Sequence, residues 1–339
     1  MSESAERGER VRLVDVARLA GVAPITVSRA LREPEKVSVD TLDRVRAAVA
    51  ETGYVPDLVA SSLTSRSSRL IGVIIPTVTA SIYAETVGAV SDALRDKRFQ
   101  SLLGNSGYDL AEEEQLVAAF LGRRADGVIL SNVLHTPGTH RLLRAARIPV
   151  VETGNLTETP IDMVVGFSNY DAAFDMIRHL AERGYRRIGF IGAVSADNPQ
   201  ASDRQRAYRD AVTHFGLARD ASLVVECPPS IEEGSRALFA LVERHPQMDA
   251  VFAAGEVWAA GASLECQRQG WQVPGRIAIG GFNDAELATL LNPPLTTVRV
   301  PRYEIGRRAV ELILDRLAGS PIPEKIVNVG YEIIVRAST

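Results

Sequence analysis

The sequence predicts an α/β protein, with an N-terminal three-helix unit followed by a two-lobed core of doubly wound parallel sheets. Three observations predict this class. The chain has 339 residues, which is more than one ordinary domain needs. Residues 11–53 carry only helical patterns. From Leu70 onward, short apolar runs alternate with amphipathic stretches, which is typical of parallel sheets covered by helices on both faces.

Nine apolar runs favour two sheets rather than one. The expected strands are 70–75, 101–103, 127–130, 150–152, 163–167, 188–191, 223–225, 250–253 and 277–282. The expected helices between them include 83–97, 112–123, 171–183, 205–215, 235–244 and 259–269.

Composition indicates an ordinary globular protein, with 46% hydrophobic and 24% charged residues. The net charge of −4 does not indicate a nucleic-acid partner, and basic and acidic side chains nearly balance within residues 1–69. Any argument for DNA binding must therefore rest on motif. The polar segment 1–10 is expected to be a disordered lead, and no apolar run is long enough for a leader or a membrane span. We expect a cytoplasmic protein whose two cysteines, Cys227 and Cys266, are buried free thiols.

Three helices are expected before residue 54. Leu13, Val16, Ala17 and Ala20 form one apolar face, and Gly21 supplies a left-handed stop. A second helix starts at Pro24 and a third follows Ser38, which suits a helix N-cap. Together they predict a small module with a thin core.

The first two helices match the spacing of a helix-turn-helix unit counted from Leu13. The fifth residue must be small because the second helix crosses above it, and the ninth must adopt left-handed backbone angles. The fifteenth residue fills the angle between the helices, and apolar residues occupy the other inward steps. All seven positions fit: Val16, Ala17, Ala20, Gly21, Val22, Val27 and Ala30. Two unrelated core helices are the alternative.

The second helix of such a unit enters the major groove of DNA. Its exposed residues are candidates to contact base edges or phosphates: Pro24, Ile25, Thr26, Ser28 and Arg29. Arg29 can donate a forked pair of hydrogen bonds to guanine, whereas Pro24 and Ile25 can read only a thymine methyl. Ser38 and Thr41 are candidate phosphate donors at the start of the third helix. For Ser38, a role as N-cap alone remains an equal alternative.

Residues 14–56 resemble the N-terminal signature of the lac/galactose repressor family. The matching residues are Val14-Asp15-Val16-Ala17, Gly21-Val22, Thr26-Val27-Ser28-Arg29-Ala30-Leu31, Val37-Ser38, Thr41, Val45 and Gly53-Tyr54-Val55-Pro56. The resemblance continues through later landmarks, among them 125–127, 183–188, 280–283 and 294–298. It implies a DNA-binding repressor whose core has a periplasmic-binding-protein-like fold.

The resemblance also implies a hinge helix that orders on operator DNA. It divides the chain into a lead at 1–10, a helix-turn-helix domain at 11–56, a hinge helix and linker at 57–69, and a core at 70–339. Tyr54, Ala60 and Leu63 take DNA-binding roles, with Leu63 as an apolar wedge in the minor groove. Packing of Leu63 between domains is the alternative. Asp57 departs from the asparagine usual after this proline, and it could cap the hinge helix.

The core is expected to pass between its two lobes three times. The first lobe comprises about 70–168 and 297–322, and the second about 169–296 and 323–339. Open parallel sheets bind ligands at the carboxyl ends of their strands. The candidate effector-binding residues there are Tyr83, Ser168, Arg204 and Asn283.

A sugar acid is the favoured effector. The resemblance makes Arg204 the anchor of the effector, and its guanidinium suits a carboxylate. Ser168 and Asn283 stand where the family often has acidic residues, so charges that would repel an anion are absent. Several runs, including Val165-Gly166-Phe167-Ser168-Asn169, resemble the gluconate-operon repressor branch and favour gluconate or a related aldonate. A neutral or phosphorylated sugar is the alternative.

Other functional classes have less support. The five histidines lack metal-ligand spacing, no nucleophile, base and oxyanion set is present, and no cofactor motif is found. We therefore expect neither an enzyme nor a metal or cofactor site. A solute-binding protein would share the lobes but not the helix-turn-helix unit. The expected partners are double-stranded operator DNA, a small-molecule effector and a second copy of the chain in a homodimer, with helix 82–97 in the dimer contact.

Overall fold

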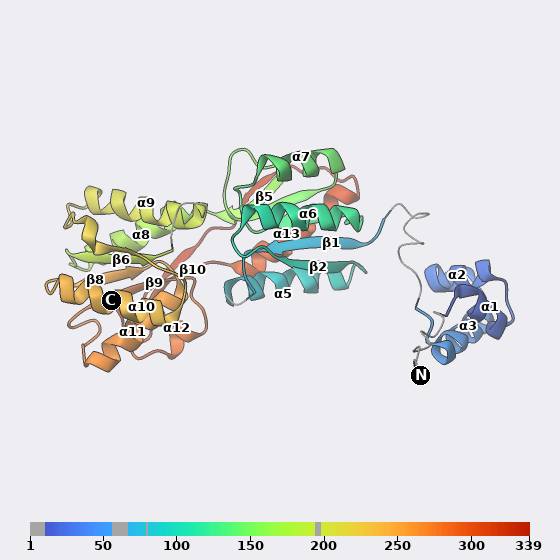
Figure 1. The fold of residues 1–339 in the computed structure, drawn as a ribbon, viewed down its shortest axis with the longest axis horizontal. Coiled ribbons are helices and arrows are strands. Elements are labelled where there is room, and N and C mark those ends of the chain that lie inside the picture. The colour runs from blue at the N-terminus through green and yellow to red at the C-terminus, as the bar shows by residue number, and fades with distance from the viewer. Residues whose placement is uncertain (1–10, 56–66, 79–80, 194–197) are drawn as a thin grey trace, which may run out of the picture. The chain divides into compact units, whose positions relative to one another are not determined.

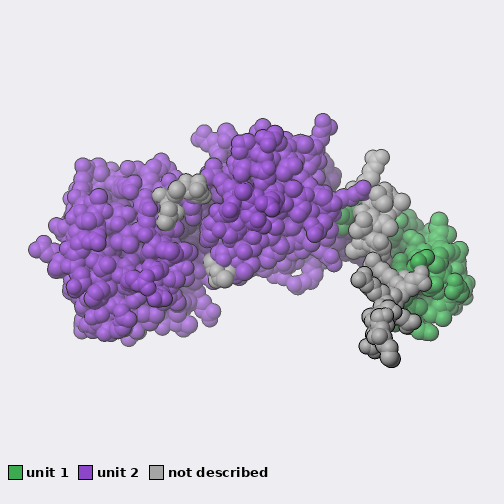
Figure 2. All heavy atoms as spheres, viewed as in Figure 1, with its two compact units in different colours: residues 1–68 green, residues 69–339 purple. Residues whose placement is uncertain are grey.

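The computed structural model describes residues 11–55, 67–78, 81–193 and 198–339. These residues form two compact units, 1–68 and 69–339, which Figure 2 shows in different colours. Within the described ranges, no helix has both the length and the apolar character needed to cross a bilayer. Ala60 and Leu63, the two hinge residues with predicted DNA contacts, lie outside the described residues.

The described residues of the smaller unit form three α-helices, as their apolar spacing predicts, and a short 3-10 turn. Its elements are α1 (Leu13–Ala20), α2 (Pro24–Arg32), η1 (Pro34–Lys36) and α3 (Val39–Thr52). A single apolar cluster holds them together, formed by Val16, Ala17, Ala20, Val27, Ala30, Val45 and Ala48. Val22 and Tyr54 pack on its edge. The seven helix-turn-helix positions therefore have the predicted environments: five are buried, Val22 is partly buried, and Gly21 makes the turn.

Backbone geometry explains how the first two helices are joined. Gly21 has a φ of 64°, in the left-handed region, where any Cβ is strained. Its N–H bonds back to the end of α1, and Val22 N–H donates to the carbonyl of Ala17 at 3.0 Å. Pro24 then starts α2, where its missing N–H costs nothing. The turn is therefore tight because of one glycine and one proline.

The larger unit contains two six-stranded sheets, each flanked by helices (Figure 1). The first sheet has the order β11-β5-β4-β3-β1-β2 and is parallel throughout. Its strands are β1 (Leu70–Ile75), β2 (Gln100–Asn105), β3 (Gly127–Leu130), β4 (Val150–Asn155), β5 (Met163–Phe167) and β11 (Ile326–Asn328). Helices α5 (Ser81–Arg95) and α13 (Arg302–Leu317) pack together beside it, and α6 (Leu110–Gly122) packs with α7 (Pro137–Ala146).

The second sheet has the order β12-β10-β9-β8-β6-β7, with only β12 antiparallel to its neighbour. Its strands are β6 (Ile188–Gly192), β7 (Val224–Glu226), β8 (Ala250–Ala253), β9 (Ala278–Phe282), β10 (Thr296–Arg299) and β12 (Glu332–Ile334). Its helical elements are α8 (Asn169–Glu182), α9 (Pro199–His214), η2 (Ala221–Leu223), α10 (Ile231–Arg244), α11 (Glu256–Gln269) and α12 (Leu287–Leu290). Cys227 and Cys266 are buried and free, as predicted.

The chain passes between the two lobes three times, but two passages come later than predicted. The first lies between β5 and α8, near residue 168 as expected. The second follows β10: residues 297–299 were predicted to begin the first-lobe segment, yet this strand pairs with β9 of the second sheet. The third follows β11: residues 326–328 were predicted in the second lobe, yet they pair with β5. Strand pairing is non-local, and the proline-rich flanks of these segments indicate only that they are irregular.

One apolar core continues through both lobes. It includes Ile71 and Val165 of the first sheet together with Phe252 and Phe282 of the second. The rings of Phe167 and Phe282 lie 6.3 Å apart, centre to centre, where the lobes adjoin. The carboxyl ends of strands from both sheets therefore come together around a common region.

Candidate functional site

A cavity of about 450 Å³ lies between the two lobes. The loops after β1 and β2 contribute Thr77 and Tyr108, and the start of α5 contributes Ile82 and Tyr83. The loops after β8 and β9 contribute Ala254, Gly255 and Asn283, and the start of α11 contributes Glu256, Val257 and Trp258. The N-terminal half of α9 adds Gln200, Ala201 and Arg204. Small-molecule sites in proteins span roughly 300–1,000 Å³ and occur at such strand ends. The cavity is thus of the right size and place for a small ligand.

Arg204 is the main cation of this cavity, and it is 9% exposed. Its Nε donates to Oδ1 of Asn169 and its Nη1 to the carbonyl of Ala254, both at 2.8 Å. The guanidinium lies over the ring of Phe282, 3.8 Å from the centroid. Burial lowers the pKa of Arg204 to about 10, so the side chain still carries its charge at neutral pH. The structure therefore holds a charged, oriented guanidinium at the cavity wall.

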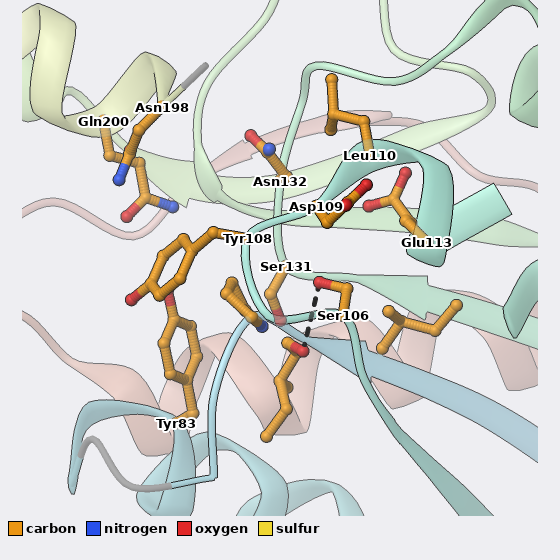
Figure 3. A pocket seen from close by; sticks show the side chains of 13 residues that line it. Tyr83, Ser106, Tyr108, Asp109, Leu110, Glu113, Ser131, Asn132, Asn198 and Gln200 are labelled. Carbon is orange, nitrogen blue, oxygen red and sulfur yellow. Dashed lines mark hydrogen bonds between the residues drawn. The ribbon is translucent and has the colours of Figure 1, made fainter. Parts of the chain in front are cut away.

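Two tyrosines form another part of the wall. Tyr83 is buried, and Figure 3 shows its ring close to that of Tyr108, with Asn198 and Gln200 facing them. Burial, followed by the nearby Tyr108, raises the pKa of Tyr83 well above its usual value, so its hydroxyl stays protonated. The phenols and amides offer both donors and acceptors, which suits a ligand rich in hydroxyl groups.

Two smaller chambers adjoin this cavity. One, of about 20 Å³, is drawn in Figure 3 and has Asp109, Glu113, Ser106, Ser131 and Asn132 among its lining residues. The other, of about 50 Å³, is lined by Arg204, Arg302, Thr86, Ser131, Thr153 and Asn283 among others. Tyr83 and Gln200 line all three spaces, so they belong to one cleft.

Glu256 connects the lobes at the edge of the cleft. Its Oε1 accepts a hydrogen bond from the hydroxyl of Ser81, the first residue of α5. Its Oε2 is buried and has no hydrogen-bond partner among the described residues. A ligand hydroxyl would satisfy that oxygen, so Glu256 is a candidate hydroxyl acceptor that the sequence did not indicate.

The structure brings three of the four predicted effector residues together. Tyr83, Arg204 and Asn283 all line the main cavity. Ser168 does not line any of these spaces: its hydroxyl accepts from the N–H of Asp171 and caps α8. A contact between Ser168 and the effector therefore stays a prediction, while its neighbour Asn169 holds Arg204. Tyr108, Gln200, Glu256 and Arg302 are further lining residues that the sequence did not single out.

His135 occupies neither the surface nor the cavity wall. Its buried imidazole lies between Glu113, 2.6 Å from Nδ1, and Glu152, 3.3 Å from Nε2. Burial alone would lower the pKa of His135, but the hydrogen bond to Glu113 and the nearby carboxylate of Glu152 outweigh it and raise the pKa to about 9. Glu113 is itself buried, at 4% exposed.

The helix-turn-helix unit presents a row of candidate DNA-contacting residues. Ile25 is 70% exposed, and Pro24 and Arg29 are also exposed, whereas Thr26 and Ser28 are partly exposed. Ser38 accepts from the N–H of Thr41 at 3.3 Å and so caps α3, which leaves its contact with phosphate a prediction. Tyr54 packs against the core of this unit. No group of three metal-ligating side chains occurs among the described residues.

Two family models match the chain. The model for bacterial regulatory proteins of the lacI family matches residues 12–57, and the model of a periplasmic binding protein-like domain matches residues 177–339. The HTH-type transcriptional regulator GntR of Escherichia coli K12 is 34% identical over 321 residues, which is 95% of this chain and 96% of the relative. The chain belongs to the lacI family.

Other relatives of this lacI-family regulator agree. The transcriptional regulator IdnR of the same organism is 33% identical, with 96% of this chain and 98% of the relative covered. A crystal structure of a lacI-family regulator from Silicibacter pomeroyi has a TM-score of 0.89 at 32% identity, covering 97% of this chain and 99% of that one. The regulator GntR from Chromobacterium violaceum has a TM-score of 0.76 at 35% identity, covering 79% and 98%. The protein is therefore a DNA-binding transcriptional regulator with a ligand-binding core.

Proposed function

We propose that this regulator is a homodimeric repressor of a palindromic operator, and that a sugar acid, gluconate or a related aldonate, controls its affinity for DNA. The observation that carries the proposal is the buried Arg204, a charged fork donor in a cleft of sugar size. Asn283 is neutral in the same wall, so this side chain does not repel a carboxylate. The two relatives named GntR and IdnR favour the same class. We place this activity in the cytoplasm, where operator DNA lies.

The mechanism is thermodynamic linkage between two sites. The effector contacts groups from both lobes, so it binds one lobe arrangement better than another. If the DNA-binding form prefers the other arrangement, the effector weakens operator binding and operator DNA weakens effector binding by the same factor. The DNA contacts that we propose are those of Pro24, Ile25, Thr26, Ser28, Arg29, Ser38, Thr41 and Tyr54, with Ala60 and Leu63 at the hinge.

A gel-shift titration tests this function. The full chain is titrated onto fragments of the intergenic DNA beside its own gene at about 100 mM salt, where non-specific binding is weak. We expect one fragment to be retarded at nanomolar concentration and released by gluconate. If a neutral or phosphorylated sugar releases the DNA and gluconate does not, the proposed effector is wrong. If no fragment is retarded, the proposal that the protein is a repressor is wrong.

A further inference from the structure

Two buried arginines from different lobes face the chamber of about 50 Å³. Arg204 belongs to α9 of the second lobe, and Arg302 is the first residue of α13 in the first lobe. Arg302 is 7% exposed. None of the described residues that line this chamber is acidic. The chamber is therefore a cationic compartment large enough for a carboxylate but not for a sugar ring.

The charge of Arg302 is only partly compensated. Its Nη2 donates to the carbonyl of Asn283, and its Nη1 lies 3.6 Å from Oε2 of Glu85. The side chain of Glu85 is 50% exposed, so water screens much of that pairing. Burial lowers the pKa of Arg302, yet a guanidinium keeps its proton at neutral pH. A buried cation whose nearest carboxylate is half-exposed is costly, and an anion in the chamber would offset part of that cost.

Arg204 also has a hydrogen-bond donor that no described residue uses. Its Nε and Nη1 are taken by Asn169 and Ala254, but no described residue accepts from its Nη2. After burial, the nearby charge of Arg302 is one of the causes that lower the pKa of Arg204, as expected of two cations held near each other. The carboxylate that would relieve this repulsion would lie between side chains from opposite lobes.

A second chamber, which shares Ser131 with the first, has the opposite character. Asp109 and Glu113 line the chamber of about 20 Å³ together with Ser106, Ser131 and Asn132 (Figure 3). Carboxylates accept hydrogen bonds from hydroxyl groups and repel other carboxylates. The two chambers therefore differ in charge. Arginines line the chamber of about 50 Å³, and carboxylates that can accept hydrogen bonds from hydroxyl groups line the chamber of about 20 Å³.

We propose that Arg302 is a second anchor for the effector's carboxylate, opposite Arg204, and that the hydroxyl-bearing chain of the effector extends toward Asp109 and Glu113. This inference rests on the proposed function and adds the orientation of the ligand. It also gives the carboxylate a mechanical role. Because Arg302 and Arg204 belong to different lobes, one bound carboxylate pairs with a cation from each lobe, which a neutral sugar cannot do.

Calorimetric titration of the full chain with gluconate and with gluconamide tests the proposal. The two probes share their hydroxyl groups and differ only in the charged group. We expect Arg302→Gln to weaken gluconate binding about tenfold or more and to change gluconamide binding by less than about threefold, since one charge-assisted pair is lost. Arg302→Lys should restore part of the difference, because it restores the charge without the fork.

Two control variants separate charge recognition from general damage. Arg308→Gln alters another arginine of α13, which pairs with Glu311 outside the cleft, and should leave both affinities unchanged. Glu85→Gln removes the exposed partner of Arg302 and should leave gluconate binding intact or tighter. Denaturant unfolding of each variant verifies that the core unit is folded.

The outcomes distinguish this inference from the proposed function. If the unchanged protein binds neither probe, the proposed effector is wrong and this inference falls with it. If the unchanged protein binds gluconate, but Arg302→Gln weakens the binding of both probes equally or of neither, the proposed effector is supported and the role of Arg302 as a second anchor is wrong. A selective loss of gluconate affinity supports both.

Discussion

Asn169 joins Arg204 to the opposite lobe. Its Oδ1 accepts from Nε of Arg204 at 2.8 Å, while its Nδ2 donates to the carbonyl of Gly154 and to Oδ1 of Asn155, each at 3.2 Å. Gly154 and Asn155 belong to β4 of the first lobe, and Asn169 begins α8 of the second. One buried amide therefore orients the effector's main anchor and spans the first passage between lobes.

Asn169→Ala should weaken gluconate binding by about 1–3 kcal/mol, because it leaves a buried charged donor without its acceptor. Calorimetric titration measures the loss. Ser168→Ala is the matched control: it removes the cap of α8, so we expect the free energy of unfolding to fall by about 1 kcal/mol with gluconate affinity unchanged. A loss of affinity in Ser168→Ala would return that residue to the effector site.

Ligand binding should be visible in the fluorescence of Trp258. The chain has two tryptophans: Trp258 lines the main cavity, and Trp271 stacks on Phe239. We expect gluconate to change the emission of Trp271→Phe, which retains Trp258, and to leave the emission of Trp258→Phe unchanged. The reverse pattern would place the ligand elsewhere.

Arg29→Ala should reduce discrimination between operator and random DNA by about 1–3 kcal/mol if this exposed side chain contacts guanine. Fluorescence anisotropy with the two DNA fragments at matched salt measures the difference. Arg18, which is exposed near the end of α1, is the control. Equal losses on both fragments would make Arg29 a phosphate contact instead.

The buried His135 should make the stability of the larger unit depend on pH. Its pKa is raised to about 9 in the folded chain, against about 6.5 when unfolded. Below pH 6.5 the imidazolium is present in both states, and its interactions with Glu113 and Glu152 contribute fully. Between about pH 6.5 and 9 only the folded state holds the proton, so the free energy of unfolding should fall by roughly 3 kcal/mol as pH rises.

Urea unfolding at several pH values measures this slope. His135→Gln should flatten it, whereas His214→Gln, at an exposed histidine, should keep it. A slope that survives in His135→Gln would have another origin.

Local patterns in the sequence predicted much of the fold. The bounds of β1, β3, β5 and β8 agree with the expected runs because buried parallel strands are continuously apolar. The helix-turn-helix positions could be predicted equally well, since a glycine with left-handed backbone angles and small residues are required at fixed steps. Strand β10 was harder to predict, because its sequence Thr296-Thr297-Val298-Arg299 does not indicate which of the two sheets it joins.

The candidate site was predicted in part for the same reason. Tyr83, Arg204 and Asn283 lie near the carboxyl ends of strands, and for Tyr83 and Arg204 it was the family resemblance that picked out the residue. Arg302 lies on a segment that returns to the first lobe after the second is built, and no local pattern places it beside Arg204. Glu113 and His135 are 22 residues apart, so their pairing depends on tertiary structure alone.

The three passages between lobes have a consequence for genetics. The first lobe is complete only when α13 and β11 have been synthesised, and the second only when β12 has followed. A stop codon between residues 168 and 299 would leave the helix-turn-helix unit intact but neither lobe whole. We expect such nonsense alleles to lose the response to the effector entirely, because none of them encodes one complete lobe.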